Sequence, residues 1–209
     1  MSPRPRNDNL TDLFGPAALA VETPPDMASL HRRLVAEADT AGLLDISYRT
    51  VDTPVGTLLL AATPAGLLRV AFQQEDLDKV LVDLAAKVSP RVLEAPGRLE
   101  GTVRQMEEYF AGRRHHFDLP LDLSLSSGFR RRVLSYLPDI AYGRTASYQV
   151  VASAVDNPRA VRAVGSACAT NPLPLVIPCH RVIRSDGLIG SYRGGVDMKR
   201  QLLELEAAA

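Results

Sequence analysis

The sequence places one of its two cysteines in a setting that suits a nucleophile. Cys179 follows an apolar run that ends at Pro178, and His180 and Arg181 come directly after it. Cysteine reacts through its thiolate, and at an ordinary pKa of about 8.5 only a few per cent of it is ionised at neutral pH. The two basic neighbours are expected to raise that fraction, which favours an activated thiol. The alternative is a buried structural cysteine, because free cysteine is among the most buried residue types.

Pro178 restricts where this cysteine can lie along the backbone. Proline does not fit a regular helix or strand interior, and it makes the preceding residue, Ile177, extended. We therefore expect Cys179 at a turn or at the start of a helix, held out toward a substrate. The other cysteine, Cys168, lies eleven residues earlier. In a reducing compartment we expect both thiols to be free.

Short blocks of sequence around Cys179 occur in an order that resembles the O6-alkylguanine-DNA alkyltransferases, also called methylated-DNA-protein-cysteine methyltransferases. The matching blocks are residues 146–149, 157–165, 171–174, 178–182, 190–195 and 202–206. They cover about residues 129–206, and a weaker resemblance begins near residue 46. One such block would be moderately specific, whereas an ordered series at compact spacing is strongly so.

The resemblance implies direct-reversal DNA repair. A nucleotide that carries O6-alkylguanine, or O4-alkylthymine, leaves the duplex and enters a pocket, and its alkyl group moves to Cys179. No nearby group can hydrolyse the thioether, so each molecule acts once, as a stoichiometric methylated-DNA-[protein]-cysteine S-methyltransferase. No cofactor is expected.

The resemblance also assigns roles to residues around the thiol. His180 acts on the thiol through a bound water and Glu206 orients His180, which is the nucleophile, base and orienter arrangement of catalytic triads. Tyr148 donates a proton near guanine N3, and Asn171 supports the active-site turn. The expected walls of the base pocket are Pro174, Val182, Tyr192 and Arg193.

Each assignment has a plainer alternative. Glu206 would otherwise be a solvated charge on a frayed helix end, Tyr148 a core tyrosine, and Asn171 a residue that shapes an Asn-Pro turn. Arg193 departs from the family, where a small residue is common, and its side chain either narrows the pocket or contacts phosphate. Leu134 is a second departure, at a position where an aromatic residue is frequent.

Charge is distributed unevenly although the formal net charge is zero. Residues 129–200 hold eleven Lys or Arg against four Asp or Glu, so this stretch carries a surplus of seven positive charges and the remainder seven negative. A basic C-terminal half indicates that one half alone faces an anionic partner. A chance distribution of solvated charge is the alternative.

Two short helices in the basic half predict a helix-turn-helix. The first is expected at about residues 147–155, with Thr145 or Ser147 as its N-cap. The second is expected at about residues 158–169, with Pro158 at its first position, and two of its arginines would project from one face among small residues. The expected DNA contacts are Arg162, Arg159, Tyr148, Ser147, Ala160 and Ala163.

The resemblance places this second helix in the minor groove of double-stranded DNA. Arg162 matches the arginine that enters the stack in place of the extruded nucleotide, and it offsets part of the few kcal/mol that unstacking costs. A surface salt bridge is the alternative for Arg162. The arginines at residues 130–132, on the first turn of a helix expected at about 128–137, either contact phosphate or form a solvated face.

The rest of the chain supplies the elements that position this half. Short β runs at residues 46–52, 57–63 and 67–72, split by turn signals, predict a small antiparallel meander. Apolar residues at helical spacing predict a helix at about 77–88 that packs on the sheet, and a second helix is expected at about 98–111, ending at Gly112.

The expected fold class is α/β (α+β), with three regions. Residues 1–45 form a partly flexible N-terminal extension, in which residues 1–27 are mobile and 27–44 contain a short helix. Residues 46–124 form an N-terminal domain with a small antiparallel sheet and helices, which the resemblance makes ribonuclease H-like. Residues 125–209 form a mostly helical, winged-helix-like domain that binds DNA and accepts the alkyl group.

Several classes of protein are excluded. No run of eighteen apolar residues or apolar signal core occurs, so we expect neither a membrane span nor secretion, and we expect a cytoplasmic monomer. No cysteine precedes Cys168, which argues against the structural zinc of some alkyltransferases and against the four-cysteine module of the family's bifunctional regulators. His115 and His116 are expected at a surface strand edge and not as metal ligands.

Two other functions are weighed against alkyl transfer. A sensor that binds alkylguanine without accepting the group resembles the alkyltransferase-like proteins, but those lack the cysteine that is present here. A cysteine hydrolase would use Cys179 and His180, yet adjacent residues rarely form a productive pair, and no peptide-sized cleft is indicated.

Overall fold

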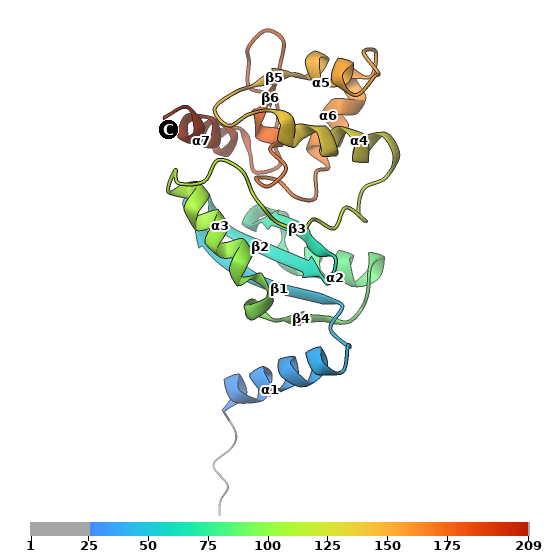
Figure 1. Cartoon of the computed structure of the whole chain (residues 1–209), viewed down its shortest axis with the longest axis vertical. Helices are drawn as coiled ribbons and strands as arrows, with labels where there is room; N and C mark the ends of the chain where they lie inside the picture. Colours follow the sequence, from blue (N-terminus) through green and yellow to red (C-terminus); the bar gives the residue numbers. More distant parts are fainter. Residues whose placement is uncertain (1–25, 209) are drawn as a thin grey trace, which may run out of the picture.

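The computed structural model of this chain describes residues 26–208. The segment expected to be mobile, residues 1–27, lies almost wholly outside the described residues. Figure 1 shows two units stacked on one another, a sheet unit formed by the first half of the chain and a helical unit formed by the second half. An extended segment joins them.

The sheet unit contains the predicted antiparallel meander. It consists of β1 (Ile46–Thr53), β2 (Gly56–Thr63) and β3 (Gly66–Phe72). A fourth strand, β4 (Val92–Glu94), pairs in parallel with β1 and gives the order β3-β2-β1-β4. β4 was not predicted, because a strand of three residues is too short to show a period-two pattern.

The predicted helices of the sheet unit pack on opposite faces of the sheet. Helix α2 (Leu77–Lys87) buries Val80 and Leu84 against one face. Helix α3 (Glu100–Phe110) packs on the other face, together with the core of the helical unit. Successive side chains of β2 alternate between the two faces, with Leu58 and Leu60 in the larger core and Leu59 in the core beneath α2.

Strand β3 is an edge strand, and segments from outside the sheet cover its free edge. The N–H of Leu67 donates to the carbonyl of Pro120 at 2.8 Å, and the N–H of Val70 donates to the carbonyl of Pro172 at 2.8 Å. At Gly66, where φ is +140°, a Cβ atom would lie 2.3 Å from the Pro120 oxygen, so only glycine permits this approach. Covering the edge joins the two units and prevents pairing with another chain.

The helical unit is built from α4 (Gly128–Tyr136), α5 (Tyr148–Ala154), α6 (Val161–Ala169) and α7 (Val196–Ala207). Both α4 and α5 pack against α6, and Leu134, one of the departures from the family, is fully buried in the shared core. A two-stranded parallel pair joins β5 (Ala146–Ser147) to β6 (Val182–Ile183). Short 3₁₀ helices connect these elements, namely η2 (Gln73–Glu75), η3 (Pro96–Leu99), η4 (Leu137–Asp139) and η5 (Cys179–Arg181).

The second helix of the predicted helix-turn-helix begins later than expected. Helix α6 begins at Val161, not at Pro158, because a turn precedes it in which the N–H of Ala160 donates to the carbonyl of Asn157 at 2.9 Å. The left-handed φ of +57° at Asp156 starts this turn. Arg159 therefore lies in the turn and not on the helix.

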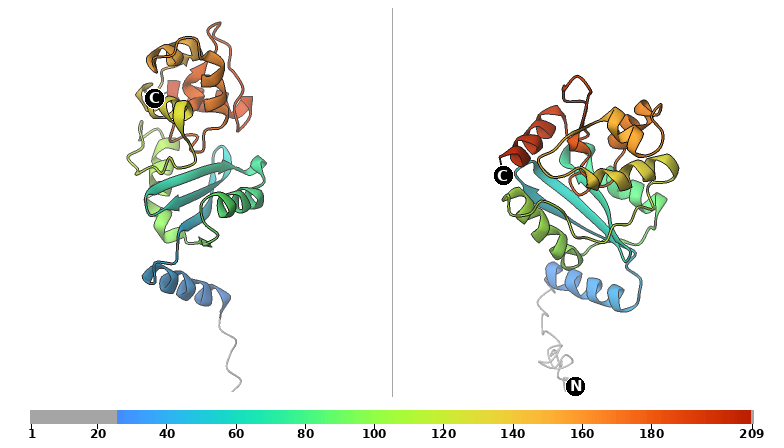
Figure 2. Two further views of the ribbon diagram at one scale, coloured as in Figure 1. Left: turned by 90° about the vertical axis from the view of Figure 1, so that its right-hand side faces the viewer. Right: turned by 45° about the horizontal axis from the view of Figure 1, so that its top comes forward.

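The extension before the sheet contains the expected helix, α1 (Met27–Thr40), which lies within the stretch 27–44. His31 Nε2 lies 2.7 Å from the carbonyl oxygen of Glu94, and Arg98 pairs with Asp39. Both views in Figure 2 place α1 at the end of the molecule away from the helical unit. Within residues 26–208 no helix is long and apolar enough to cross a membrane.

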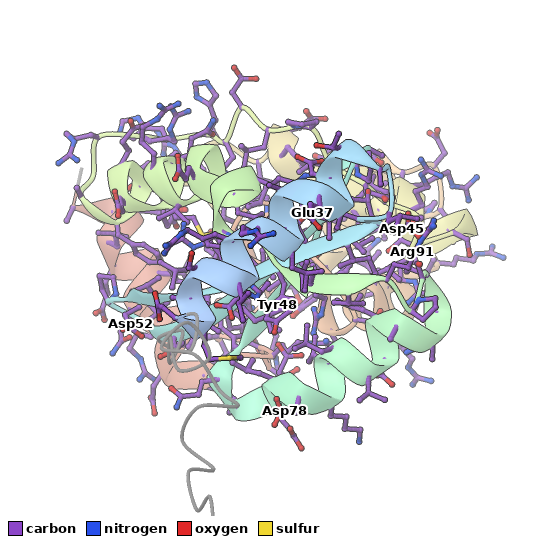
Figure 3. The ribbon with its side chains drawn as sticks, turned by 90° about the horizontal axis from the view of Figure 1, so that it is seen from below. Glu37, Asp45, Tyr48, Asp52, Asp78 and Arg91 are labelled. Atoms are coloured by element: carbon purple, nitrogen blue, oxygen red, sulfur yellow. The ribbon has the colours of Figure 1, made fainter. Side chains whose placement is uncertain are left out.

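Figure 3 shows the face of the sheet unit that lies away from the helical unit. Asp45 and Arg91 lie close together there, near β4, and Arg91 Nε donates to Asp45 Oδ2 at 2.8 Å. This pair is remote from the residues that the sequence singles out for chemistry.

Candidate active site

Cys179 is the first residue of η5, directly after Pro178, so the prediction of a cysteine at the start of a helix is confirmed. Asn171 holds it in place. The Asn171 Nδ2 group donates to the carbonyl of Ile177 at 2.9 Å and to Cys179 Sγ at 3.2 Å, while its Oδ1 accepts from the N–H of Leu173 at 3.0 Å. Asn171 thus both shapes its turn and contacts the sulfur.

The thiol lies deeper than the sequence indicates. Cys179 is only 3 % exposed, so it is not held out toward solvent. Burial raises the pKa of the Cys179 thiol, although the hydrogen bond from Asn171 and the charge of Lys199 oppose the rise. The expectation that the basic neighbours favour the thiolate is therefore wrong for this conformation. Both cysteines are free, as expected.

Glu206, on α7, orients His180 as the sequence predicts. His180 Nε2 lies 2.9 Å from Glu206 Oε1, and both side chains are buried. The alternative of a frayed, solvated Glu206 is wrong. Hydrogen bonds from His180 and Arg181 outweigh the effect of burial and lower the pKa of Glu206 to about 2, so this carboxylate is ionised at neutral pH.

Three further residues contact the same carboxylate. The Arg181 guanidinium donates to both oxygens of Glu206 at 2.9 Å. The Tyr109 hydroxyl, from α3, donates to Glu206 Oε1 at 2.8 Å, so the sheet unit contributes directly to this network. The N–H of Gly143 donates to Oε2 at 3.3 Å. Buried charges need such partners, because an unpaired carboxylate in this setting would be costly.

No local pattern indicates that Tyr109 and Arg181 contact Glu206. Tyr109 is not among the residues expected at the site, and Arg181 is expected only to favour the thiolate. The Tyr109–Glu206 contact joins residues 97 positions apart, and no local pattern can predict such a pairing. A buried tyrosine whose hydroxyl must find a partner is the one available signal.

The geometry fixes the protonation of His180. An ionised carboxylate only accepts hydrogen bonds, so Nε2 carries the ring proton and Nδ1 of the neutral ring is the acceptor. Burial lowers the pKa of His180, which keeps the ring neutral. Within residues 26–208, Nδ1 has no hydrogen-bond partner. His180 is thus arranged as a base, with its acceptor atom unoccupied by protein groups.

Lys199 is a buried cation that the sequence analysis overlooked. It is fully buried on α7, and its Nζ donates to the carbonyl of Val182 at 2.6 Å. Nζ also lies 6.0 Å from the centre of the Tyr148 ring. Lys199 lowers the pKa of Cys179, against the larger effect of burial, so it provides positive charge near the sulfur.

Tyr148 is the first residue of α5, and its half-buried ring packs against the larger core. A Cβ atom added to Gly190 would lie 2.7 Å from the Tyr148 oxygen, so the loop before α7 passes directly over this group. Burial raises the pKa of Tyr148 to about 12. At neutral pH the hydroxyl is protonated and able to donate.

The expected pocket walls surround this region. Pro174 and Val182 are buried, the latter at the start of β6. The Tyr192 ring lies edge-on to His180, with ring centres 6.4 Å apart, and its buried hydroxyl has no partner within the described residues. Of these expected walls, Tyr192 is the one with a ring contact to His180.

Arg193 contacts groups that the sequence did not indicate. Its Nη1 donates to Glu75 Oε2 at 2.8 Å, and its Nε donates to the carbonyl of Ala169 at 3.2 Å. The side chain therefore ties the loop before α7 to the sheet unit and to the end of α6.

The residues expected to contact DNA lie together around the start of α5 and α6. Arg162 and Ala163 are exposed on the first turn of α6, and Arg159 is exposed in the preceding turn. Arg162 forms no ion pair in the described part of the chain, so the alternative of a surface salt bridge is wrong. Ser147 is the N-cap of α5, accepting from the N–H of Val150 at 3.2 Å. Ala160 precedes α6 as its N-cap.

His115 and His116 do not lie at a strand edge as expected. They lie in the irregular segment after α3, where the His115 ring stacks on Tyr142 with ring centres 4.2 Å apart. Among the described residues, no group of three or more His, Cys, Asp or Glu side chains could hold a metal ion.

Comparison with known proteins identifies relatives of both units. Residues 46–123 match the family model of the ribonuclease-like domain of 6-O-methylguanine DNA methyltransferase, and residues 128–208 match the model of its DNA binding domain. The methylated-DNA–protein-cysteine methyltransferase of Mycobacterium tuberculosis is 38 % identical over 161 residues, which cover 77 % of this chain and 92 % of the relative.

Two further comparisons extend this likeness. The Escherichia coli bifunctional transcriptional activator/DNA repair enzyme Ada is 37 % identical over 166 residues, which cover 78 % of this chain but 46 % of Ada. The crystal structure of Mycobacterium tuberculosis OGT in complex with DNA superposes with a TM-score of 0.69 at 38 % identity, covering 78 % of this chain and 93 % of that one.

Proposed function

The chain belongs to the 6-O-methylguanine DNA methyltransferase family, and we propose that Cys179 is the alkyl acceptor of the repair reaction this membership implies. The chain binds DNA and repairs it by direct reversal, as an enzyme that transfers an alkyl group to a cysteine of its own. The observation that carries the assignment to Cys179 is a single chain of contacts, in which Asn171 contacts the sulfur and Glu206 orients the adjacent His180.

The transfer is a direct displacement at the alkyl carbon. The Cys179 sulfur forms a bond to this carbon while the bond from carbon to guanine O6 breaks, and the electron pair of that bond stays on the guanine. His180 Nδ1 accepts the thiol proton through a bound water, and the ionised Glu206 stabilises the resulting imidazolium. Because burial disfavours a free thiolate, proton transfer accompanies the approach of the substrate.

The leaving guanine needs a proton or a hydrogen bond. Tyr148 supplies it near guanine N3, which agrees with its protonated hydroxyl and its place beneath the loop at Gly190. Pro174, Val182 and Tyr192 form the walls of the base pocket. The same pocket accepts O4-alkylthymine as a second substrate, and no cofactor takes part.

Base access requires extrusion of the nucleotide from the duplex. Helix α6 enters the minor groove, where its exposed first turn allows close approach at Ala163 and where Arg162 fills the gap left in the stack. Arg159, Ala160 and Ser147 line the same surface. We assign this binding and acceptor function to residues 125–209, the ribonuclease H-like fold to residues 46–124 and an extension to residues 1–45, and we expect a cytoplasmic monomer.

The experiment that tests this function incubates the protein with a duplex that carries one O6-methylguanine and then weighs the intact protein. Transfer predicts a gain of one methyl group, which Cys179→Ala abolishes. A protein of unchanged mass that binds the lesion tightly would instead be the non-transferring sensor. Repeated turnover without a mass change would indicate a hydrolase.

A further inference from the structure

A second ionic cluster joins the loop before α7 to the sheet unit. Glu75, the last residue of η2, accepts a hydrogen bond from Arg193 at 2.8 Å and another from the Arg69 guanidinium, both on Oε2. Its Oε1 accepts from the N–H of Phe72 at 2.9 Å. The Glu75 side chain is only 13 % exposed. A largely buried carboxylate shared by two guanidinium groups is a strong and geometrically specific contact.

The same cluster reaches the segment that holds the thiol. Arg69, on β3, donates from Nη1 to the carbonyl of Pro172 at 3.2 Å, and the N–H of Val70 donates to the same oxygen at 2.8 Å. Pro172 directly follows Asn171, whose amide contacts Cys179 Sγ. The edge of the sheet therefore fixes one side of the active site at Pro172.

Arg193 ties the loop before α7 to the same carboxylate. Its contacts with Glu75 and with the carbonyl of Ala169 hold the loop at the residue next to Tyr192. The Tyr192 ring lies between Phe72 of the sheet unit, 5.6 Å away between ring centres, and His180, 6.4 Å away. The position of this pocket wall thus depends on a carboxylate that belongs to the other unit.

We infer that Glu75 is a positioning residue for alkyl transfer, which acts through Arg193 to hold Tyr192 against His180. The inference rests on the proposed function, because it concerns the pocket in which the proposed transfer occurs. Glu75 contacts no reacting atom. Its loss should loosen one wall of the pocket, and a misplacement of about 1 Å can slow a reaction about a hundredfold. Because Tyr192 keeps its packing on Phe72, we expect a smaller loss of about tenfold.

The test measures transfer from an O6-methylguanine duplex at saturating DNA, so that the rate of transfer is separated from binding. Glu75→Gln removes the charge but keeps an oxygen for the N–H of Phe72. We expect the saturated rate to fall about tenfold while the half-saturating DNA concentration stays unchanged. The matched control is Asp45→Asn, which breaks the Asp45–Arg91 pair on the remote face seen in Figure 3 and should leave the rate unchanged.

A second measurement uses iodoacetamide, a small electrophile that needs no base pocket. If Glu75 positions the wall, iodoacetamide alkylates Cys179 of Glu75→Gln at least as fast as Cys179 of the unsubstituted protein. The buried Cys168 stays unreactive in both. Slower alkylation of Cys179, or new reactivity at Cys168, would overturn the inference by showing general damage. Faster methyl transfer by Glu75→Gln would also overturn the inference, because the Glu75–Arg193 pair would then restrain access to the sulfur.

The partners can be tested against each other. If Glu75 acts through Arg193, the double variant Glu75→Gln/Arg193→Ser is no slower than the slower single variant. Arg193→Lys keeps the charge but has no Nε–H group for the Ala169 carbonyl. Its saturated transfer rate should lie between the rates of the unsubstituted protein and of Arg193→Ser. Independent, multiplying losses would contradict the inference. Failure of the unsubstituted protein to gain a methyl group would instead reject the proposed function itself.

Discussion

Glu206 determines the protonation of His180 and connects this histidine to both units. Its ionised carboxylate fixes the proton of His180 on Nε2, pairs with Arg181 and accepts from Tyr109 of the sheet unit. A single residue thereby couples the base to both units of the molecule. The sequence motif identified Glu206, His180 and Cys179, because residues of these types occur at family positions, but it could not identify Tyr109.

The lowered pKa of Glu206 predicts a pH dependence of stability. Because the folded value of about 2 lies below the ordinary 4.5, ionised Glu206 stabilises the fold above about pH 4.5, and this contribution is lost as the pH falls toward 2. The shift corresponds to a contribution on the order of 3 kcal/mol. Urea unfolding of the unsubstituted protein and of Glu206→Gln should show a difference in unfolding free energy that is largest near pH 6 and shrinks between pH 4.5 and 3. A difference that stays constant with pH would contradict this.

Arg162 gives a second prediction at the scale of one residue. It is exposed and has no ion-pair partner in the described part of the chain, so Arg162→Ala should fold normally. Without a side chain to fill the stack, repair of a duplex should slow far more than reaction with free O6-benzylguanine, which needs no extrusion. The two rates are measured on one preparation. Equal losses on both substrates would argue against insertion.

At the scale of elements, the start of α6 separates the two arginines that the sequence placed on one helix. Asp156 and the Asn157–Ala160 hydrogen bond form a turn, and α6 begins only at Val161. Pro158 suits the first position of a helix, because proline has a helical φ and no N–H group. The helix boundary is instead set by the backbone conformation of the preceding turn, which composition does not specify.

This boundary predicts different roles for the two arginines. Arg159, in the turn, can contact a phosphate but cannot enter the stack with the helix. Arg159→Ala should weaken duplex binding, reduce the slope of log affinity against log salt by about 1, and leave the saturated transfer rate unchanged. Arg104→Ala, an exposed arginine on α3, should change neither quantity. A fall in the saturated rate of Arg159→Ala as large as that of Arg162→Ala would contradict the distinction.

At the scale of the whole molecule, the sheet unit is part of the active site and not only a support for it. Tyr109, Phe72 and Glu75 all reach residues of the helical unit. The meander, the main helices and the catalytic motif could be predicted because each produces a local pattern or a family block. The burial of Cys179 could not, because it arises where distant segments of the two units meet.

The contacts of the two thiols, and not their burial, distinguish Cys179 from Cys168. Cys168 and Cys179 are both free and both buried, and burial raises the pKa of each. Only Cys179 has Asn171 on its sulfur and a neighbouring histidine held by a carboxylate. Selectivity between the two thiols is therefore a direct consequence of the site geometry.

The most direct measurement maps the methyl group after reaction with an excess of O6-methylguanine duplex. Digestion and mass spectrometry of the peptides that carry Cys168 and Cys179 locate the modification, and the loss of lesions gives the number repaired per chain. Single-turnover transfer to Cys179 predicts one methyl group per chain, all of it on Cys179, and no lesions repaired beyond that number. Methylation of Cys168, or repair of more lesions than there are chains, would contradict it.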